Sequence, residues 1–329
     1  MNSNQSRNLT VRFWGARGSI PSPAPENMRY GGNTSCVELR YGEQILILDA
    51  GSGLRPLGQA LIDSANGGPI SATLLLSHTH WDHIQGLPFF APGYLAENRI
   101  RILGHHGWEL RLQNALVNQM SPAHFPVGLE QMRGLRAVEA LAPGTTELDG
   151  FLIQTTELNH PGGCAGFRIE TGAAALGYLP DHEPYRIENR QGEPVMRLHH
   201  KLVEFIRGLD VLILDTQYTA AEYTGRVGWG HGCLPDSVHL AMEAGVRRLI
   251  MFHHDPSHGD EQIDQMLATA RALVLGSGLA VDAATENETI SLGDSGAVQA
   301  GSGAAGEIAE GPKGQDFVPR VPSRALGLL

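Results

Sequence analysis

Cysteine, positive charge and long apolar runs are all scarce in this 329-residue sequence. The three cysteines, Cys36, Cys164 and Cys233, lie far apart and form no C-x-x-C pair, so we expect no disulfide framework and a reducing compartment. No stretch approaches the ~18 consecutive apolar residues of a membrane span. The first residues, MNSNQSRNLTVRFWG, also lack the apolar core of a signal peptide. These absences predict a cytoplasmic protein without a membrane partner.

Acidic residues outnumber basic ones, with 35 Asp plus Glu against 24 Lys plus Arg, for a formal net charge of -11. Proteins that hold long polyanions usually carry a basic balance, so a long nucleic acid on the outer surface is not expected. Hydrophobic residues make up 42% of the chain, which is enough to bury a large core. Histidine, at 15 residues, is the unusual component.

Short β-branched or leucine-rich runs alternate with helical patterns along the chain. The runs predict strands at 9–14, 35–41, 44–49, 72–77, 99–103, 151–158, 166–170, 174–179, 210–215 and 247–252. Apolar spacing near 3.6 predicts helices at 54–65, 108–120, 195–208, 235–245 and 260–274. The strands form one cluster before residue 105 and another after residue 150. This order predicts an α/β protein with two sheets packed face to face and helices outside.

The composition changes near residue 297. We predict one domain over residues 1–296, followed by a flexible tail rich in Gly, Ala and Pro over residues 297–329. The alternative for the tail is an arm that docks on a partner. The segment 104–150 is either a lid over the site or an excursion that only packs against the domain. A homodimer is left open.

The most specific motif is TLLLSHTHWDHIQGLPFF, in which His78 follows directly on an apolar strand. His80, Asp82 and His83 come within the next five positions, at a junction from strand to loop to helix. Imidazole and carboxylate are suitable ligands for zinc, and also for iron or manganese. Residues 78 and 80 can converge on one metal, while residues 82 and 83 can serve a second.

Further ligand candidates stand where other predicted strands end. His160 follows FLIQTTELN, Asp181 follows AALGYLP, and His253 follows RRLIMF. Ligands at the carboxyl ends of strands are the arrangement that open sheets use for binding sites. Asp181 can bridge two metals because a carboxylate has two oxygens.

With these residues, the chain resembles the metallo-β-lactamase fold superfamily over roughly residues 9–292. It is most similar to the phosphodiesterase branch, which includes ribonuclease Z and the cyclic-phosphate phosphodiesterases. The resemblance implies a four-layer αββα sandwich with two mixed sheets, flanked by helices. It also implies two divalent ions, with zinc expected and manganese or iron as alternatives. The implied ligands are His78, His80 and His160 for one ion, Asp82, His83 and His253 for the other, and Asp181 between them.

His253 is preferred to His254 because LIMFHHDP resembles a strand that ends in T-H-F-S-P in this branch, where the histidine is a ligand. The neighbouring His254 is the alternative.

Two more segments resemble this branch. DVLILDTQY places Asp215 at the glutamate of its H-E-A-T segment, and GWGHGC places His231 at the histidine of its G-H-S-T segment. Gly232 and Cys233 depart from the family's Ser and Thr, which changes the support of His231.

The resulting hypothesis is a dinuclear metal-dependent hydrolase, in which a metal-bridging hydroxide attacks a small cyclic or linear phosphodiester such as a cyclic nucleotide or a cyclic ribose phosphate. Asp82 and Asp181 would orient the hydroxide, and Asp82 would take its proton. His231, oriented by Asp215, would protonate the leaving group.

Three alternatives remain open. The first is a metallohydrolase of a lactone, thioester or β-lactam, for which a dinuclear site would serve equally well. The second is an RNA-processing nuclease of the ribonuclease Z type, although only 21 positions separate His160 from Asp181. That spacing leaves no room for the long basic arm that ribonuclease Z members insert there. The third is a metal-binding sensor on a catalytic fold.

Overall fold

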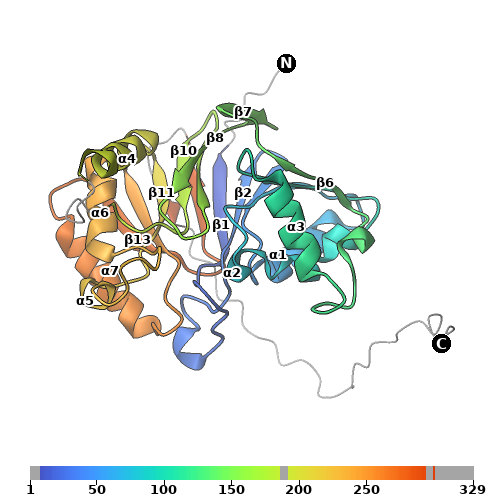
Figure 1. Cartoon of the computed structure of the whole chain (residues 1–329), viewed down its shortest axis with the longest axis horizontal. Helices are drawn as coiled ribbons and strands as arrows, with labels where there is room; N and C mark the ends of the chain where they lie inside the picture. The colour runs from blue at the N-terminus through green and yellow to red at the C-terminus, as the bar shows by residue number, and fades with distance from the viewer. Residues whose placement is uncertain (1–7, 186–191, 294–298, 301–329) are drawn as a thin grey trace.

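The computed structural model describes residues 8–185, 192–293 and 299–300. In this part of the chain, two mixed β-sheets lie face to face and helices cover their outer faces (Figure 1). The expected four-layer αββα sandwich is therefore confirmed.

The first sheet has eight strands among the described residues, in the order β15-β14-β1-β2-β3-β4-β5-β6. β3 to β6 run parallel to one another, and the other neighbours are antiparallel. Its strands are β1 (Leu9–Gly15), β2 (Cys36–Tyr41), β3 (Gln44–Leu48), β4 (Ser71–Leu75), β5 (Arg99–Gly104), β6 (Leu135–Ala140), β14 (Thr289–Leu292) and β15 (Gln299–Ala300).

The second sheet has seven strands in the described ranges, in the order β13-β12-β11-β10-β9-β8-β7. β10 to β13 are parallel, and β7 to β10 form an antiparallel meander. Its strands are β7 (Thr145–Leu148), β8 (Phe151–Leu158), β9 (Cys164–Glu170), β10 (Ala175–Leu179), β11 (Val211–Asp215), β12 (Arg248–Phe252) and β13 (Ala280–Ala283).

The helices divide between the two outer faces, as Figure 1 shows. The α-helices are α1 (Leu54–Ala65), α2 (Trp81–Ile84), α3 (Glu109–Gln119), α4 (Gly192–Phe205), α5 (Ala220–Tyr223), α6 (Leu234–Glu243) and α7 (Asp260–Leu273). Single 3-10 turns are η1 (Pro25–Asn27), η2 (Leu87–Phe89), η3 (Ala91–Tyr94) and η4 (Leu129–Gln131). Apolar residues of α1 and α3 pack on the first sheet, and those of α4, α6 and α7 pack on the second.

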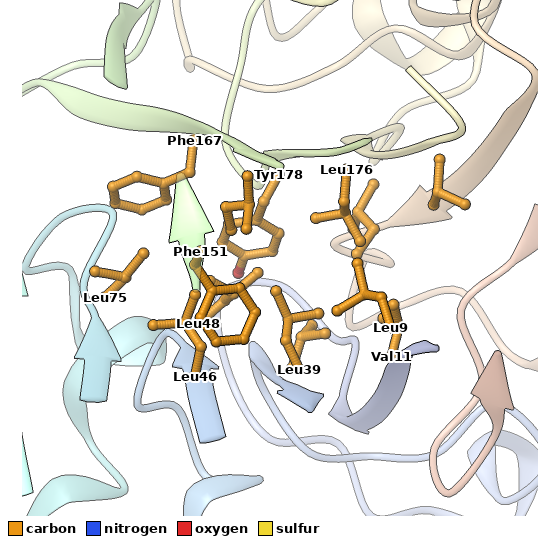
Figure 2. Close-up of a cluster of buried hydrophobic side chains, with 14 of the residues drawn as sticks. Leu9, Val11, Leu39, Leu46, Leu48, Leu75, Phe151, Phe167, Leu176 and Tyr178 are labelled. Atoms are coloured by element: carbon orange, nitrogen blue, oxygen red, sulfur yellow. The ribbon is translucent and has the colours of Figure 1, made fainter. Parts of the chain in front are cut away.

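The central core lies between the two sheets. Leu39, Leu46 and Leu48 from the first sheet meet Phe151, Phe167 and Tyr178 from the second (Figure 2). Because alternate residues of each strand face this layer, both sheets contribute one buried face to it. The core fixes one sheet against the other, and therefore places their strand ends side by side.

All ten predicted strands are present, and their ends lie within two residues of the expected ones. The strands β6, β7, β13, β14 and β15 were not predicted. Each is an edge strand or lies next to one, and each has two to six residues, so its pattern is short. β6 and β7 also show that part of the segment 104–150 belongs to the sheets.

The domain boundary at residue 296 stays a prediction. Gln299–Ala300, placed in the expected tail, pairs with β14, and residues 301–329 of that tail lie outside the described residues. All three cysteines are buried, and none of these described residues forms a disulfide. Among the described helices, none combines the length and apolar character needed to cross a membrane.

Candidate metal centre

Five strand ends meet at one edge of the sandwich and carry the candidate ligands. β4 of the first sheet leads to His78, and β8, β10 and β12 of the second sheet lead to His160, Asp181 and His253. β11 ends on Asp215. Parallel strands end at the same edge of a sheet, so residues distant in sequence come together here.

The first group of side chains consists of His78, His80, His160 and Asp181, whose potential ligand atoms lie within 4.8 Å of one another. His160 Nε2 is 3.0 Å from His80 Nδ1 and 3.7 Å from Asp181 Oδ2. His78 Nε2 is 3.6 Å from the same Asp181 oxygen. Ligand atoms about 2.0–2.2 Å from a tetrahedral ion are roughly 3.4 Å apart, so these separations fit one ion.

The second group consists of Asp82, His83 and His253, again with ligand atoms within 4.8 Å. Asp82 Oδ2 is 3.2 Å from His83 Nε2 and 3.1 Å from His253 Nε2. The backbone N–H of Ser19 donates to the same carboxylate oxygen at 2.8 Å, which fixes the orientation of Asp82.

Asp181 lies between the two groups and turns one oxygen toward each. Its Oδ2 faces His78 and His160, while its Oδ1 is 3.1 Å from His83 Nε2 and 3.5 Å from His253 Nε2. This is the arrangement expected of a bridging carboxylate.

The chemistry of the buried atoms fits a cation. His78 Nε2, His83 Nε2 and Asp181 Oδ1 are buried and have no hydrogen-bond partner. Buried polar atoms are almost always paired, and these three unpaired ligand-type atoms, which belong to the two groups, are suited to binding divalent metal.

The electrostatics of the site also favour cations. Burial lowers the pKa of His78, His80 and His160, which keeps these imidazoles in the neutral form that binds metals. Burial alone would lower the pKa of His253, but the carboxylates of Asp181 and Asp82 raise it to about 9. The acidic pair thus attracts positive charge.

Outer hydrogen bonds orient several of these imidazoles. His83 Nδ1 is 2.7 Å from Asp49 Oδ2, and His253 Nδ1 is 3.0 Å from Gln217 Oε1. His160 Nδ1 is 2.8 Å from the carbonyl oxygen of Gly230. Such partners fix the ring and leave the other nitrogen for a metal.

Asp49 and Gln217 were not expected from the sequence. Asp49 ends the apolar run LILD, as Asp215 ends VLILD, and that parallel is a signal that could have found it.

His231 and Asp215 form a pair beside the two groups. His231 Nδ1 is 3.0 Å from Asp215 Oδ2, and its ring stacks on that of His253 with centroids 4.8 Å apart. Asp215 is fully buried and also accepts the backbone N–H groups of Gln217 and His182. Gly232 is required here, because a Cβ at this position would lie 2.1 Å from the Asp215 carbonyl oxygen.

His254 points away from the centre. Its Nε2 is 3.0 Å from the carbonyl oxygen of Ala284, and burial lowers its pKa to about 3. His253 is the histidine of this pair that reaches the two groups.

Comparison with known proteins decides the family. Residues 45–254 match the family model described as the beta-lactamase superfamily domain. The chain belongs to the metallo-β-lactamase superfamily. It is accordingly a metal-dependent hydrolase, and its clustered histidines and aspartates are the groups suited to divalent metal binding.

This superfamily member has curated relatives and solved structural neighbours. It is 24% identical over 293 residues to ribonuclease Z of Thermoplasma acidophilum, an alignment that spans 78% of this chain and 89% of the relative. Its fold is similar to that of the metallo-beta-lactamase fold protein YhfI from Bacillus subtilis, with a TM-score of 0.63, 21% identity and coverage of 86% and 99%. The unliganded yeast PDE1 structure also has a TM-score of 0.63, with 15% identity and coverage of 87% and 99%.

Proposed function

We propose that this superfamily member is a dinuclear phosphodiesterase that acts on a small cyclic or linear phosphodiester. The observation that carries the proposal is Asp181, whose two oxygens face two separate ligand groups beside the His231–Asp215 pair. A pair of divalent ions would neutralise the charge of a phosphodiester, and a proton donor beside them would assist a poor leaving group.

The proposed ligand roles follow the two groups. His78, His80 and His160 would hold one ion, and Asp82, His83 and His253 the other, with Asp181 shared. Zinc is the ion we propose, since its preferred ligands include both imidazole and carboxylate. When bound, the two ions would supply Lewis acidity and lower the pKa of a coordinated water.

Asp82 would orient the attacking water, since its backbone partner Ser19 fixes the carboxylate. Burial alone would raise the pKa of Asp82, but the imidazoles of His83 and His253 hold it well below its usual range. The sequence predicts two roles for Asp82, orientation of the water and acceptance of its proton, and both belong to the proposal.

His231 would act as the general acid. Asp215 accepts a hydrogen bond from Nδ1–H, so Nε2 is left to donate a proton to the departing alkoxide. The His231 side chain keeps 13% of its surface exposed, whereas His253 beneath it is fully buried. His231 is therefore the member of this stack that a substrate can reach.

Metal analysis and a substrate panel test the proposal together. We expect about two ions per chain, and hydrolysis of bis-p-nitrophenyl phosphate in preference to a lactone, a thioester or a β-lactam. His231→Ala should retain the metals and lower kcat for diesters with poor leaving groups, with a smaller effect on p-nitrophenyl esters. One ion per chain, or faster turnover of the thioester, would contradict the proposal.

A second candidate is RNA processing, because the curated relative is a ribonuclease Z. In this chain β9 and β10 are joined directly by residues 171–174, so the segment between His160 and Asp181 is occupied by a hairpin. A tRNA precursor with a 3′ extension in the same panel separates the two candidates. Cleavage of the precursor at a rate above that of small diesters would favour the nuclease.

A further inference from the structure

One exposed turn beside His231 is built more rigidly than a surface loop requires. Its sequence is Gly228-Trp229-Gly230, and both glycines have positive φ, at 88° and 87°. The Trp229 side chain is 60% exposed, which is unusual for the largest apolar residue type. An exposed indole on a constrained backbone is typical of a recognition surface.

A buried carboxylate holds this turn in place. Glu183 accepts the N–H groups of Gly228 at 2.7 Å and Gly230 at 2.8 Å, one on each side of Trp229. The hydroxyl of Tyr223 donates to the same carboxylate at 2.7 Å. The Gly230 carbonyl in turn lies against His160, so the turn is joined to the proposed metal centre.

Arg226 adds positive charge to the same surface. Its guanidinium lies 4.9 Å from the ring centroid of Tyr218 and 5.8 Å from that of Trp229. Within the described residues, no carboxylate lies at ion-pair distance from this guanidinium. The two aromatic rings orient the guanidinium of Arg226, and its N–H groups are available to bind an anion.

The cluster adjoins the proposed general acid. The rings of Tyr218 and His231 have centroids 6.0 Å apart in an edge-to-face arrangement. A group released next to His231 would therefore depart past Tyr218, Arg226 and Trp229.

We infer that Trp229 and Arg226 form the subsite for the leaving-group side of the substrate. The indole would stack on an aromatic ring such as a nucleobase, and the guanidinium would bind a phosphate oxygen. The inference rests on the proposed phosphodiesterase function and adds that the preferred diesters carry a base, as nucleotides do and base-free sugar phosphates do not.

A matched pair of substrates tests the subsite in the metal-loaded, full-length protein. Adenosine 2′,3′-cyclic phosphate and methyl riboside 2′,3′-cyclic phosphate differ only in the base. Trp229→Ala should raise KM for the first roughly 5- to 100-fold, the range of base stacking on an aromatic side chain, and leave the second unchanged. Trp229→Phe should restore most of the affinity. Arg226→Ala should raise KM for both, since both carry the phosphate.

Leu275→Ala and Arg55→Ala are matched controls, because both residues are exposed and lie at the end of α7 and on α1, away from the centre. Both controls should leave KM unchanged. Equal KM values for the two substrates in the wild-type protein would overturn the inference, as would an unchanged preference in Trp229→Ala. A change of oligomeric state in Trp229→Ala with unchanged KM would also overturn it, and would indicate a contact between copies of the chain.

Failure of the phosphodiesterase proposal can be recognised separately. If the wild-type protein hydrolyses neither diester, calorimetry with adenosine 5′-monophosphate and ribose 5-phosphate tests the subsite without turnover. Tighter binding of the adenosine compound, lost in Trp229→Ala, would support the subsite. Equal binding of both compounds, or no binding of either, would overturn it.

Discussion

Substitution of Asp49 is a strong test of the proposed metal centre. Asp49 is not a proposed ligand itself, but it contacts the proposed ligand His83 and orients its ring. Its fully buried carboxylate accepts bonds from Ser77 N at 2.7 Å, Ser77 Oγ at 2.8 Å and Tyr178 Oη at 2.7 Å, besides its contact with His83 Nδ1. Oδ2 takes three of these contacts and Oδ1 takes the fourth. We consider the substitution Asp49→Asn, which keeps the shape and removes the charge.

The amide cannot reproduce this pattern in either orientation. With its oxygen at the Oδ2 position, its NH₂ group meets the N–H of Ser77, donor against donor. With the groups exchanged, the NH₂ meets His83, Tyr178 and the Ser77 hydroxyl. At least one buried donor is then unpaired, at a cost of about 1–3 kcal/mol in the free energy of unfolding. Loss of an outer carboxylate typically weakens metal binding by about 10- to 100-fold, equal to roughly 1.4–2.7 kcal/mol.

The two quantities are measured by urea unfolding of the metal-free protein and by competition with a chelator for zinc. Asp63→Asn is the matched control, because Asp63 is exposed on α1 and accepts a hydrogen bond from Gln59 of the same helix. The control should change neither quantity. An Asp49→Asn protein that binds zinc as tightly as the wild type would refute the claim that Asp49 orients His83 for a metal.

Further predictions concern the same centre. His253→Ala should reduce the metal content toward one ion per chain, whereas His254→Ala should leave the stoichiometry intact; metal analysis giving the reverse would exchange their roles. Gly18→Ala should weaken metal binding, because its Cβ would lie 2.4 Å from the His253 ring. Gly225→Ala is the control in the same titration, because its Cβ would make only an ordinary contact, 3.9 Å from the carbonyl oxygen of Glu222. Removal of the metals should lower the free energy of unfolding by about 4 kcal/mol for each ion, relative to protein at an ion concentration 1,000-fold above Kd, and an unchanged denaturation midpoint would count against a folded-state site.

The local pattern of the chain was enough to predict the fold class. Runs such as VLILD and RRLIMF are short, apolar and rich in β-branched or leucine residues, so they form buried strands wherever they are placed. The H-x-H-x-D-H motif needed no tertiary information either, since four ligand-type side chains within six positions rarely follow an apolar strand except at a metal site. Short strands such as β13 were missed because four residues carry too little pattern, and their pairing is decided by neighbouring strands.

Other features depended on the packing of one sheet against the other. Sequence resemblance suggested that Asp181 is shared, but only the position of β10 relative to β4 turns one oxygen to His78 and the other to His83. The end of β12 likewise determines which of His253 and His254 reaches the ligand groups, because successive side chains there point in opposite directions. Short sequence motifs are thus enough to predict which residues are ligands. The grouping of the ligands and the rigid Trp229 turn depend on contacts between residues far apart in the chain.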